Sequence, residues 1–135
     1  MRTLVPLFLL TLTAALYAQK QPALPDEKSL IAGREIYLSN CQSCHMEQGE
    51  GLEGVYPPLA KSDYLMADKS RAVRQILNGV NGSIKVNGVE YNAEMQGFSF
   101  SDQELVDLLN YIRNSFGNKG GVTTIEEVRK AKTKS

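Results

Sequence analysis

The sequence predicts a mainly α-helical domain of about 117 residues, with one short β-hairpin. Apolar residues recur at helical spacing in several segments. Two Ser/Thr-x-x-Glu sequences stand where helices would begin, as in a capping box. An Asn-Gly pair lies between two short arms of alternating polarity, which is typical of a two-residue hairpin turn. The expected helices cover residues 27–40, 71–79, 105–116 and 125–132, and the expected hairpin covers residues 84–91.

The first helix is expected over residues 27–40, where Leu30, Gly33 and Tyr37 fall on one face. Gly33 costs about 1 kcal/mol relative to alanine inside a helix. It therefore predicts that another helix approaches closely at this point, the alternative being a glycine that is merely tolerated.

The middle of the chain begins as an ordered loop over residues 46–65, since its glycines and paired prolines exclude a long helix. Asp68 or Ser70 can cap the next helix, over residues 71–79, whose apolar residues follow helical spacing. In the hairpin, Asn87–Gly88 predicts a type I′ turn.

The clearest helix follows the capping box of Ser101 and Glu104 and carries one apolar stripe through to Phe116. A glycine-rich link and a short helix over residues 125–132 make up the segment 117–135. The basic end of that last helix is interpreted as a solvated terminus favoured by the helix dipole, with docking through Lys130, Lys132 and Lys134 as the alternative.

Residues 1–18 have the pattern of a secretory signal: a basic start, an apolar run too short to span a bilayer, and small residues at its end. An uncleaved anchor is the alternative. Residues 19–28 are interpreted as a flexible lead. We therefore expect an exported, periplasmic protein with no stable membrane insertion after cleavage.

Charge and composition exclude some functions. Without the signal, 14 basic residues face 15 acidic ones, and no basic stripe indicates nucleic-acid binding. The chain has no Trp and a modest apolar fraction, so its side-chain core should be thin. Something besides side chains is expected to fill it.

The pentapeptide Cys41-Gln42-Ser43-Cys44-His45 holds both cysteines and the only histidine. C-x-x-C-H is the attachment sequence for c-type haem. Two thiols three positions apart can each add to one vinyl group of the same porphyrin, and the adjacent histidine can reach the iron. One haem c per chain, bound covalently through Cys41 and Cys44, is therefore predicted.

Three other sites for this pentapeptide are less favoured. A thioredoxin-type dithiol needs a βαβ setting, which the sequence does not predict. A structural zinc site needs four ligands, more than the Cys and His present can supply. A disulfide would close a very tight loop.

The second axial ligand cannot be a histidine from the same chain, because no other exists. Met46 adjoins His45 and cannot reach the opposite face of the ring. Met95 lies in a loop before the strong C-terminal helix and is the preferred ligand. Met66, which is more simply a core residue, and an open iron are the alternatives. His/Met ligation raises the reduction potential and suits one-electron transfer.

With these residues in view, the chain resembles the class I c-type cytochromes, most closely the small bacterial periplasmic monohaem proteins. The resemblance covers residues 29–116. It implies the small cytochrome c fold, in which N- and C-terminal helices cross around a haem pocket. Gly33 and Tyr37 match the first helix of the family, and Leu108 and Tyr111 match its contact on the last.

The resemblance also implies further site residues. Pro57 would offer its carbonyl to His45 Nδ1–H, and Leu59 would pack on the ring. Asn92 resembles a position that braces the methionine sulfur or a propionate. Two residues depart from the family pattern: Met46 replaces a glycine, and Gln96 replaces a proline after the axial methionine, which predicts a less rigid Met95 loop.

The function expected from this resemblance is that of an electron carrier rather than an enzyme, with transient redox partners: a donor complex and a terminal oxidase or reductase. An accessory haem subunit of a larger respiratory or nitrite-reducing complex, and a haem sensor with a displaceable methionine, are the alternatives. Glu47, Glu50 and Glu53 lie near the expected electron exit and could steer a basic partner, or could simply be solvated.

Overall fold

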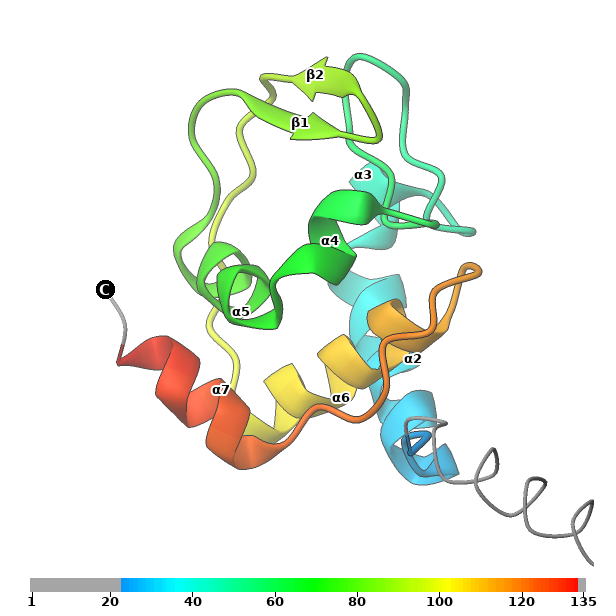
Figure 1. The fold of residues 1–135 in the computed structure, drawn as a ribbon, viewed down its shortest axis with the longest axis vertical. Helices are drawn as coiled ribbons and strands as arrows, with labels where there is room; N and C mark the ends of the chain where they lie inside the picture. The colour runs from blue at the N-terminus through cyan, green and yellow to red at the C-terminus, as the bar shows by residue number, and fades with distance from the viewer. Residues whose placement is uncertain (1–22, 134–135) are drawn as a thin grey trace, which may run out of the picture.

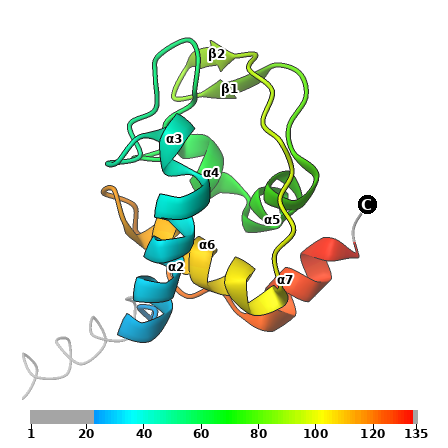
Figure 2. The same ribbon diagram turned by 180° about the vertical axis from the view of Figure 1, so that it is seen from behind.

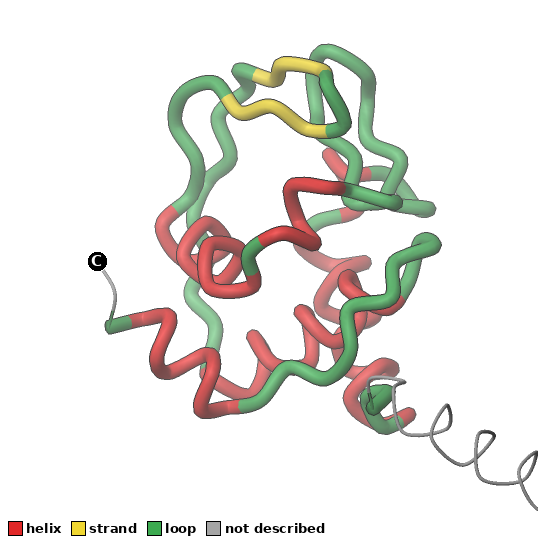
Figure 3. The backbone as a smooth tube through the Cα atoms, in the orientation of Figure 1, coloured by secondary structure: helices red, strands yellow, loops and turns green. Residues whose placement is uncertain are grey.

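A computed structural model describes residues 23–133, and these residues form a mainly helical domain with one two-stranded sheet, as predicted. The helices are α2 (Glu27–Asn40), α3 (Gln42–His45), α4 (Asp63–Ala67), α5 (Lys69–Asn78), α6 (Asp102–Asn114) and α7 (Ile125–Lys132). The strands are β1 (Ile84–Val86) and β2 (Val89–Tyr91) (Figures 1 and 3). The predicted signal segment 1–18, the first part of the lead and Lys134 lie outside the described residues.

Helices α2 and α6 cross closely, as Figures 1 and 2 both show. The contact is centred on Gly33, where an added Cβ would lie 2.0 Å from the carbonyl oxygen of Asp107 and 2.7 Å from Tyr111 Cβ. The close helix approach predicted from Gly33 is therefore confirmed. Only a residue without a side chain permits this backbone separation.

An aromatic cluster of Tyr37, Tyr111 and Phe116 closes one end of the crossing, with ring centroids 5.2–5.6 Å apart. Tyr37 is fully buried, and its hydroxyl donates to the carbonyl of Met46 at 2.6 Å. The prediction that the helix runs to Phe116 was wrong: α6 ends at Asn114, and Phe116 has a φ of 58°. Its ring reaches the cluster from the turn that follows.

A buried polar network ties the crossing to the segment after α6. Ser29 Oγ donates to Asp107 at 2.6 Å and accepts from the side-chain amide of Asn110 at 2.9 Å. The amide oxygen of Asn110 accepts from the backbone N–H of Thr123 at 2.7 Å. The link to α7 is thus fixed by side chains of the core.

The middle of the chain differs from the sequence-based expectation in one place. Helix α4, capped by the hydroxyl of Ser62 on the N–H of Leu65, interrupts the predicted loop 46–65. Asp68 rather than Ser70 caps α5, which begins at Lys69. The predicted hairpin is confirmed: Val86 pairs with Val89, and φ is positive at both turn residues.

Helix α7 packs against α5 and α6 and buries Val128 and Ala131 completely. Its basic end is not simply solvated, because Arg129 and Lys132 both form ion pairs with Asp102, at 2.9 and 2.6 Å. These contacts make α7 part of the domain. Within residues 23–133, no helix combines the length and the apolar character that crossing a membrane requires.

Candidate functional site

Cys41 joins α2 to the short helix α3, which carries Cys44 and His45. The carbonyl of Cys41 accepts from the N–H groups of Cys44 and His45, at 3.2 and 2.9 Å. Both thiols are free and partly exposed. Burial, and to a lesser extent Cys44, raises the pKa of the Cys41 thiol to about 11. Both cysteines therefore lie at one wall of a cleft.

His45 is oriented by the loop that follows it. Its Nδ1 lies 2.9 Å from the carbonyl oxygen of Pro57, the contact that the resemblance implied. A carbonyl can only accept, so Nδ1 carries the proton and Nε2 keeps a free lone pair. Burial lowers the pKa of His45, with the Pro57 contact acting in the opposite direction. A neutral imidazole with a free Nε2 is the form that binds a metal.

Met95 lines the other wall of the cleft. Its backbone forms an antiparallel bridge with Val80, at 2.9 and 3.0 Å. Three residues on, the N–H of Phe98 donates to the carbonyl of Ile76 at 2.8 Å. The methionine is thus fixed to the end of α5, although Gln96 stands where the family commonly has proline.

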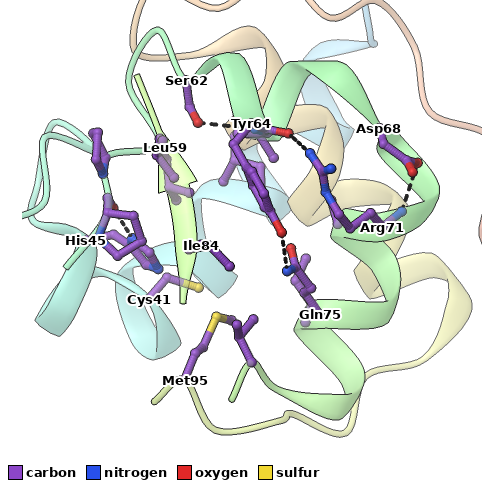
Figure 4. Close-up of a pocket in the computed structure, with 18 of the residues that line it drawn as sticks. Cys41, His45, Leu59, Ser62, Tyr64, Asp68, Arg71, Gln75, Ile84 and Met95 are labelled. Carbon is purple, nitrogen blue, oxygen red and sulfur yellow. Dashed lines mark hydrogen bonds between the residues drawn. The ribbon is translucent and has the colours of Figure 1, made fainter. Parts of the chain in front are cut away.

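The cleft itself lies between these two walls, as Figure 4 shows. It comprises an inner pocket and an outer cavity of about 460 Å³, which share Cys41, His45, Pro57, Val80, Ile84 and Met95. The sulfur atoms of Cys41 and Met95 both point into the inner pocket (Figure 4). The remaining lining of that pocket is mostly apolar and includes Leu59, Leu65, Ala72, Ile76, Val80, Ile84, Val86, Leu108 and Ile112.

A polar group at the inner end of the cleft was missed by sequence reasoning. The guanidinium of Arg71 lies 3.6 Å above the ring of Tyr64 and donates to the Tyr64 carbonyl. Gln75 donates to the Tyr64 hydroxyl at 2.8 Å. All three side chains line the pocket. The signal available in the sequence was the i, i+4 spacing of Arg71 and Gln75, beside the apolar stripe of α5.

The other residues singled out from the sequence occupy different places. Leu59 is half-buried in the wall of the inner pocket. Asn92 is exposed and is not among the residues that line the cleft. Met66 is half-buried on α4 and is likewise absent from the lining.

These residues fit a haem. The cleft is largely apolar, as the body of a porphyrin requires, while a cationic side chain at its inner end suits a carboxylate. A neutral imidazole and a thioether, both good ligands for haem iron, line it from separate segments. The two thiols stand at the edge where a covalent link would form.

Comparison with known proteins agrees with this fit. The family model for cytochrome c matches residues 30–116. The chain is 34% identical to cytochrome c-552 of Thermus thermophilus, over 76% of this chain and 85% of that protein. It is also 29% identical to the cytochrome c subunit of a quinone alcohol dehydrogenase from Gluconobacter oxydans (strain 621H), over 88% of this chain.

The second of these relatives is much longer, and the chain spans only 29% of its length. A gluconate 2-dehydrogenase cytochrome c subunit from Pantoea cypripedii, 29% identical over 67% of this chain, is matched over 21% of its own length. These longer proteins therefore contain much that this chain does not match.

Members of the cytochrome c family bind haem c covalently through cysteines, and the attachment sequence stands here at residues 41–45. The fold, the apolar cleft and the comparisons agree. This chain belongs to the cytochrome c family: it is an electron-transfer haem protein, with haem c attached through Cys41 and Cys44.

Proposed function

We propose that this protein is a periplasmic monohaem electron carrier that shuttles single electrons between redox proteins. The observation that supports the proposal is that each wall of the cleft carries a side chain able to bind iron. His45 is oriented by Pro57, and Met95 is fixed by its bridge to Val80. An iron held on both sides has no free position for a substrate.

Each residue then has a role toward the cofactor. Cys41 and Cys44 would form the thioethers, His45 Nε2 and Met95 Sδ would hold the iron, and Leu59 would pack on the ring. Pro57 keeps the proton on Nδ1. When bound, haem c supplies a one-electron couple.

The polar group at the inner end of the cleft would receive a propionate. Arg71 provides the charge, and Tyr64 and Gln75 hold it in place through the stacked ring and their hydrogen bond. A paired carboxylate lessens the cost of a cation in an apolar pocket. Asn92, which is exposed, would act only on a part of the haem at the surface.

The proposed location and partners are supported by the sequence and the relatives. Residues 1–18 have the pattern of an export signal, and one attachment sequence implies one haem. Relatives that are subunits of dehydrogenases support a donor of that class. A terminal oxidase or reductase would then take the electron.

Absorption spectra of the haem-loaded protein test this function. We expect sharp ferrous bands that carbon monoxide does not shift, because Met95 closes the sixth position. Met95→Ala should bind carbon monoxide readily, while the matched control Met66→Ala should not. A wild-type spectrum that shifts at once under carbon monoxide would contradict the carrier and favour a sensor.

A second candidate is an accessory subunit of a larger dehydrogenase complex, favoured by the names of the longer relatives. The packed face of α7 is already used inside the domain, so docking would have to use other surfaces. Purification from native membranes and periplasm separates the two. Recovery of the haem protein alone, in the periplasmic fraction, supports the carrier; stable association with a dehydrogenase supports the subunit.

A further inference from the structure

We propose that one end of the molecule, here called the acidic end, docks a redox protein that presents basic residues around an apolar centre. The acidic end comprises Glu47, Glu50 and Glu53 on the loop after α3, with Glu90 and Glu94 on the hairpin and the segment that follows it. This inference rests on the proposed electron-carrier function and names the chemistry of its partner.

The two segments lie at the same end of the molecule. Figures 1 and 2 both show the loop between α3 and α4 projecting beside β1 and β2. All five glutamates are exposed. Their carboxylates therefore face the solvent from one end of the fold.

Charge is distributed unevenly along the chain. Residues 46–56 and 82–97 together carry five Glu and one basic residue, Lys85, while the whole chain has no net charge. The balancing cations lie mainly on other segments, including α5 and α7. A protein with separated charges orients an oppositely charged partner before contact and speeds productive encounters.

Two large apolar side chains are exposed within this charged loop. Leu52 is 49% exposed and Val55 is 42% exposed. The loop holds them in place, because Leu52 and Tyr56 exchange backbone hydrogen bonds at 2.9 and 2.7 Å. A loop that was merely solvated would explain the glutamates but not these side chains. Apolar residues inside a polar rim are the usual composition of an interface.

The acidic end is also in direct contact with the site. The N–H of Gly51 donates to the carbonyl of His45 at 3.0 Å. Glu94 lines the outer cavity of the cleft and precedes Met95. A partner bound here would rest against both walls of the cleft, where the path for an electron is short.

Other occupants fit the charges less well. An anionic membrane surface would be repelled by the glutamates. For a second copy of this chain, fewer cations of α7 are available, because Arg129 and Lys132 are already paired with Asp102. A basic protein is the occupant that the charges favour.

The first test uses two small redox probes of opposite charge on the reduced, haem-loaded protein. In each reaction one electron leaves the protein and reduces tris(phenanthroline)cobalt(III) to cobalt(II), or ferricyanide to ferrocyanide. The variant is E47Q/E50Q/E53Q. At low ionic strength, the ratio of the cation rate to the anion rate should fall about tenfold. The change should nearly vanish at 1 M salt, where the Debye length is about 3 Å.

The matched control, E27Q/E35Q/E126Q, removes the same number of charges from exposed sites on α2 and α7. Its rate ratio should change less than twofold. An equal fall in variant and control would overturn the proposal, because net charge alone would then explain the effect. If the wild-type protein reacts with neither probe, the electron-carrier function itself fails, which distinguishes the two proposals.

The second test examines the apolar centre, with a strongly basic monohaem cytochrome c as electron acceptor. L52S/V55S should slow this reaction several-fold and leave both small-probe rates unchanged. An unchanged protein-to-protein rate would exclude these residues from the docking surface. Sedimentation at low salt tests whether a second copy of this chain binds the acidic end instead. Self-association of the wild-type protein that E47Q/E50Q/E53Q abolishes would assign the acidic end to a second copy. That result would overturn the proposal of a basic partner.

Discussion

Met95 and Val80 exchange both of their backbone hydrogen bonds, at 2.9 and 3.0 Å, so the methionine wall of the cleft is built onto the end of α5. The contact is close enough to exclude side chains. An added Cβ on Gly97 would lie 2.4 Å from the carbonyl oxygen of Leu77, and one on Gly79 would lie 2.4 Å from that of Met95. Two glycines therefore set the position of the methionine.

Gly97→Ala should displace Met95 from the iron without unfolding the protein. The new methyl group must push the strand away from the carbonyl of Leu77, and Met95 lies two residues before it. We expect carbon monoxide to bind the reduced variant and the reduction potential to fall, as loss of a thioether ligand implies. The control is Gln96→Ala, at an exposed neighbour, which should keep the wild-type spectrum. A closed spectrum in Gly97→Ala would show that the bridge does not position the ligand.

Gly33→Ala should destabilise the protein by about 2–3 kcal/mol, as overpacking does. The added methyl group would sit 2.0 Å from Asp107 O, so α2 and α6 must separate. This cost exceeds the roughly 1 kcal/mol that alanine gains over glycine in a helix. Urea unfolding measures it, and Ile31→Ala on the exposed face of α2 should change stability by less than about 0.5 kcal/mol. Equal stability of Gly33→Ala and wild type would mean that the crossing adapts at no cost.

Met46→Gly should be more stable than Met46→Ala by about 1–2 kcal/mol, a typical cost of a strained backbone conformation. Met46 has φ 65° and ψ 171°, a region that glycine adopts freely and that a Cβ disfavours. Both variants lose the same side chain beyond Cβ, so their difference isolates the backbone. The difference between the unfolding free energies of the two variants measures this backbone strain. If Met46→Ala were the more stable variant, strain at this position would be excluded.

The packing of α7 should weaken in acid. Lys132 first, and Arg129 second, lower the pKa of Asp102, because both cations favour its ionised form. A lowered folded-state pKa stabilises the protein above the ordinary carboxyl pKa, and this stability is lost as the pH falls through the lowered value. Asp102→Asn should therefore be less stable than wild type at pH 7, and the gap should close toward pH 3.

Urea unfolding across that pH range measures the gap. Glu35→Gln, an exposed change on α2, serves as the control. A difference between Asp102→Asn and wild type that persists unchanged in acid would mean that the two ion pairs do not hold α7.

Local signals predicted the elements whose ends are set by side chains close in sequence. The capping boxes at Ser101 and Thr124 and the Asn87–Gly88 turn all appear as expected. Helix α4 was not predicted from the sequence, because five residues are too few to show apolar periodicity. Ser62, which caps this helix, was the available signal. The end of α6 was placed too late because Phe116 continues the apolar stripe while its backbone turns away.

Some residues of the site could likewise be predicted from the sequence, and others could not. The attachment sequence is contiguous, so residues 41–45 could be identified from spacing alone. The Arg71–Tyr64–Gln75 group could not, because it depends on how α4 and α5 meet, and α4 was unforeseen. Likewise, the Val80–Met95 bridge joins residues on either side of the hairpin. Only the folded chain shows that this bridge holds the Met95 segment against the end of α5.

The α2–α6 crossing joins parts of the chain far apart in sequence: Ser29 and Asp107, bonded at 2.6 Å, are 78 positions apart. Apart from Leu108 and Ile112, the residues that line the cleft lie on the loop of chain between them. A protease cut at the exposed tip of the loop, near Glu53, would place Cys41, Cys44 and His45 on one fragment and Met95 on the other. The crossing would still bind the fragments to each other, so the nicked protein should retain its cofactor and both ligands. Cleavage of the backbone and loss of the cofactor are therefore separate events in this fold.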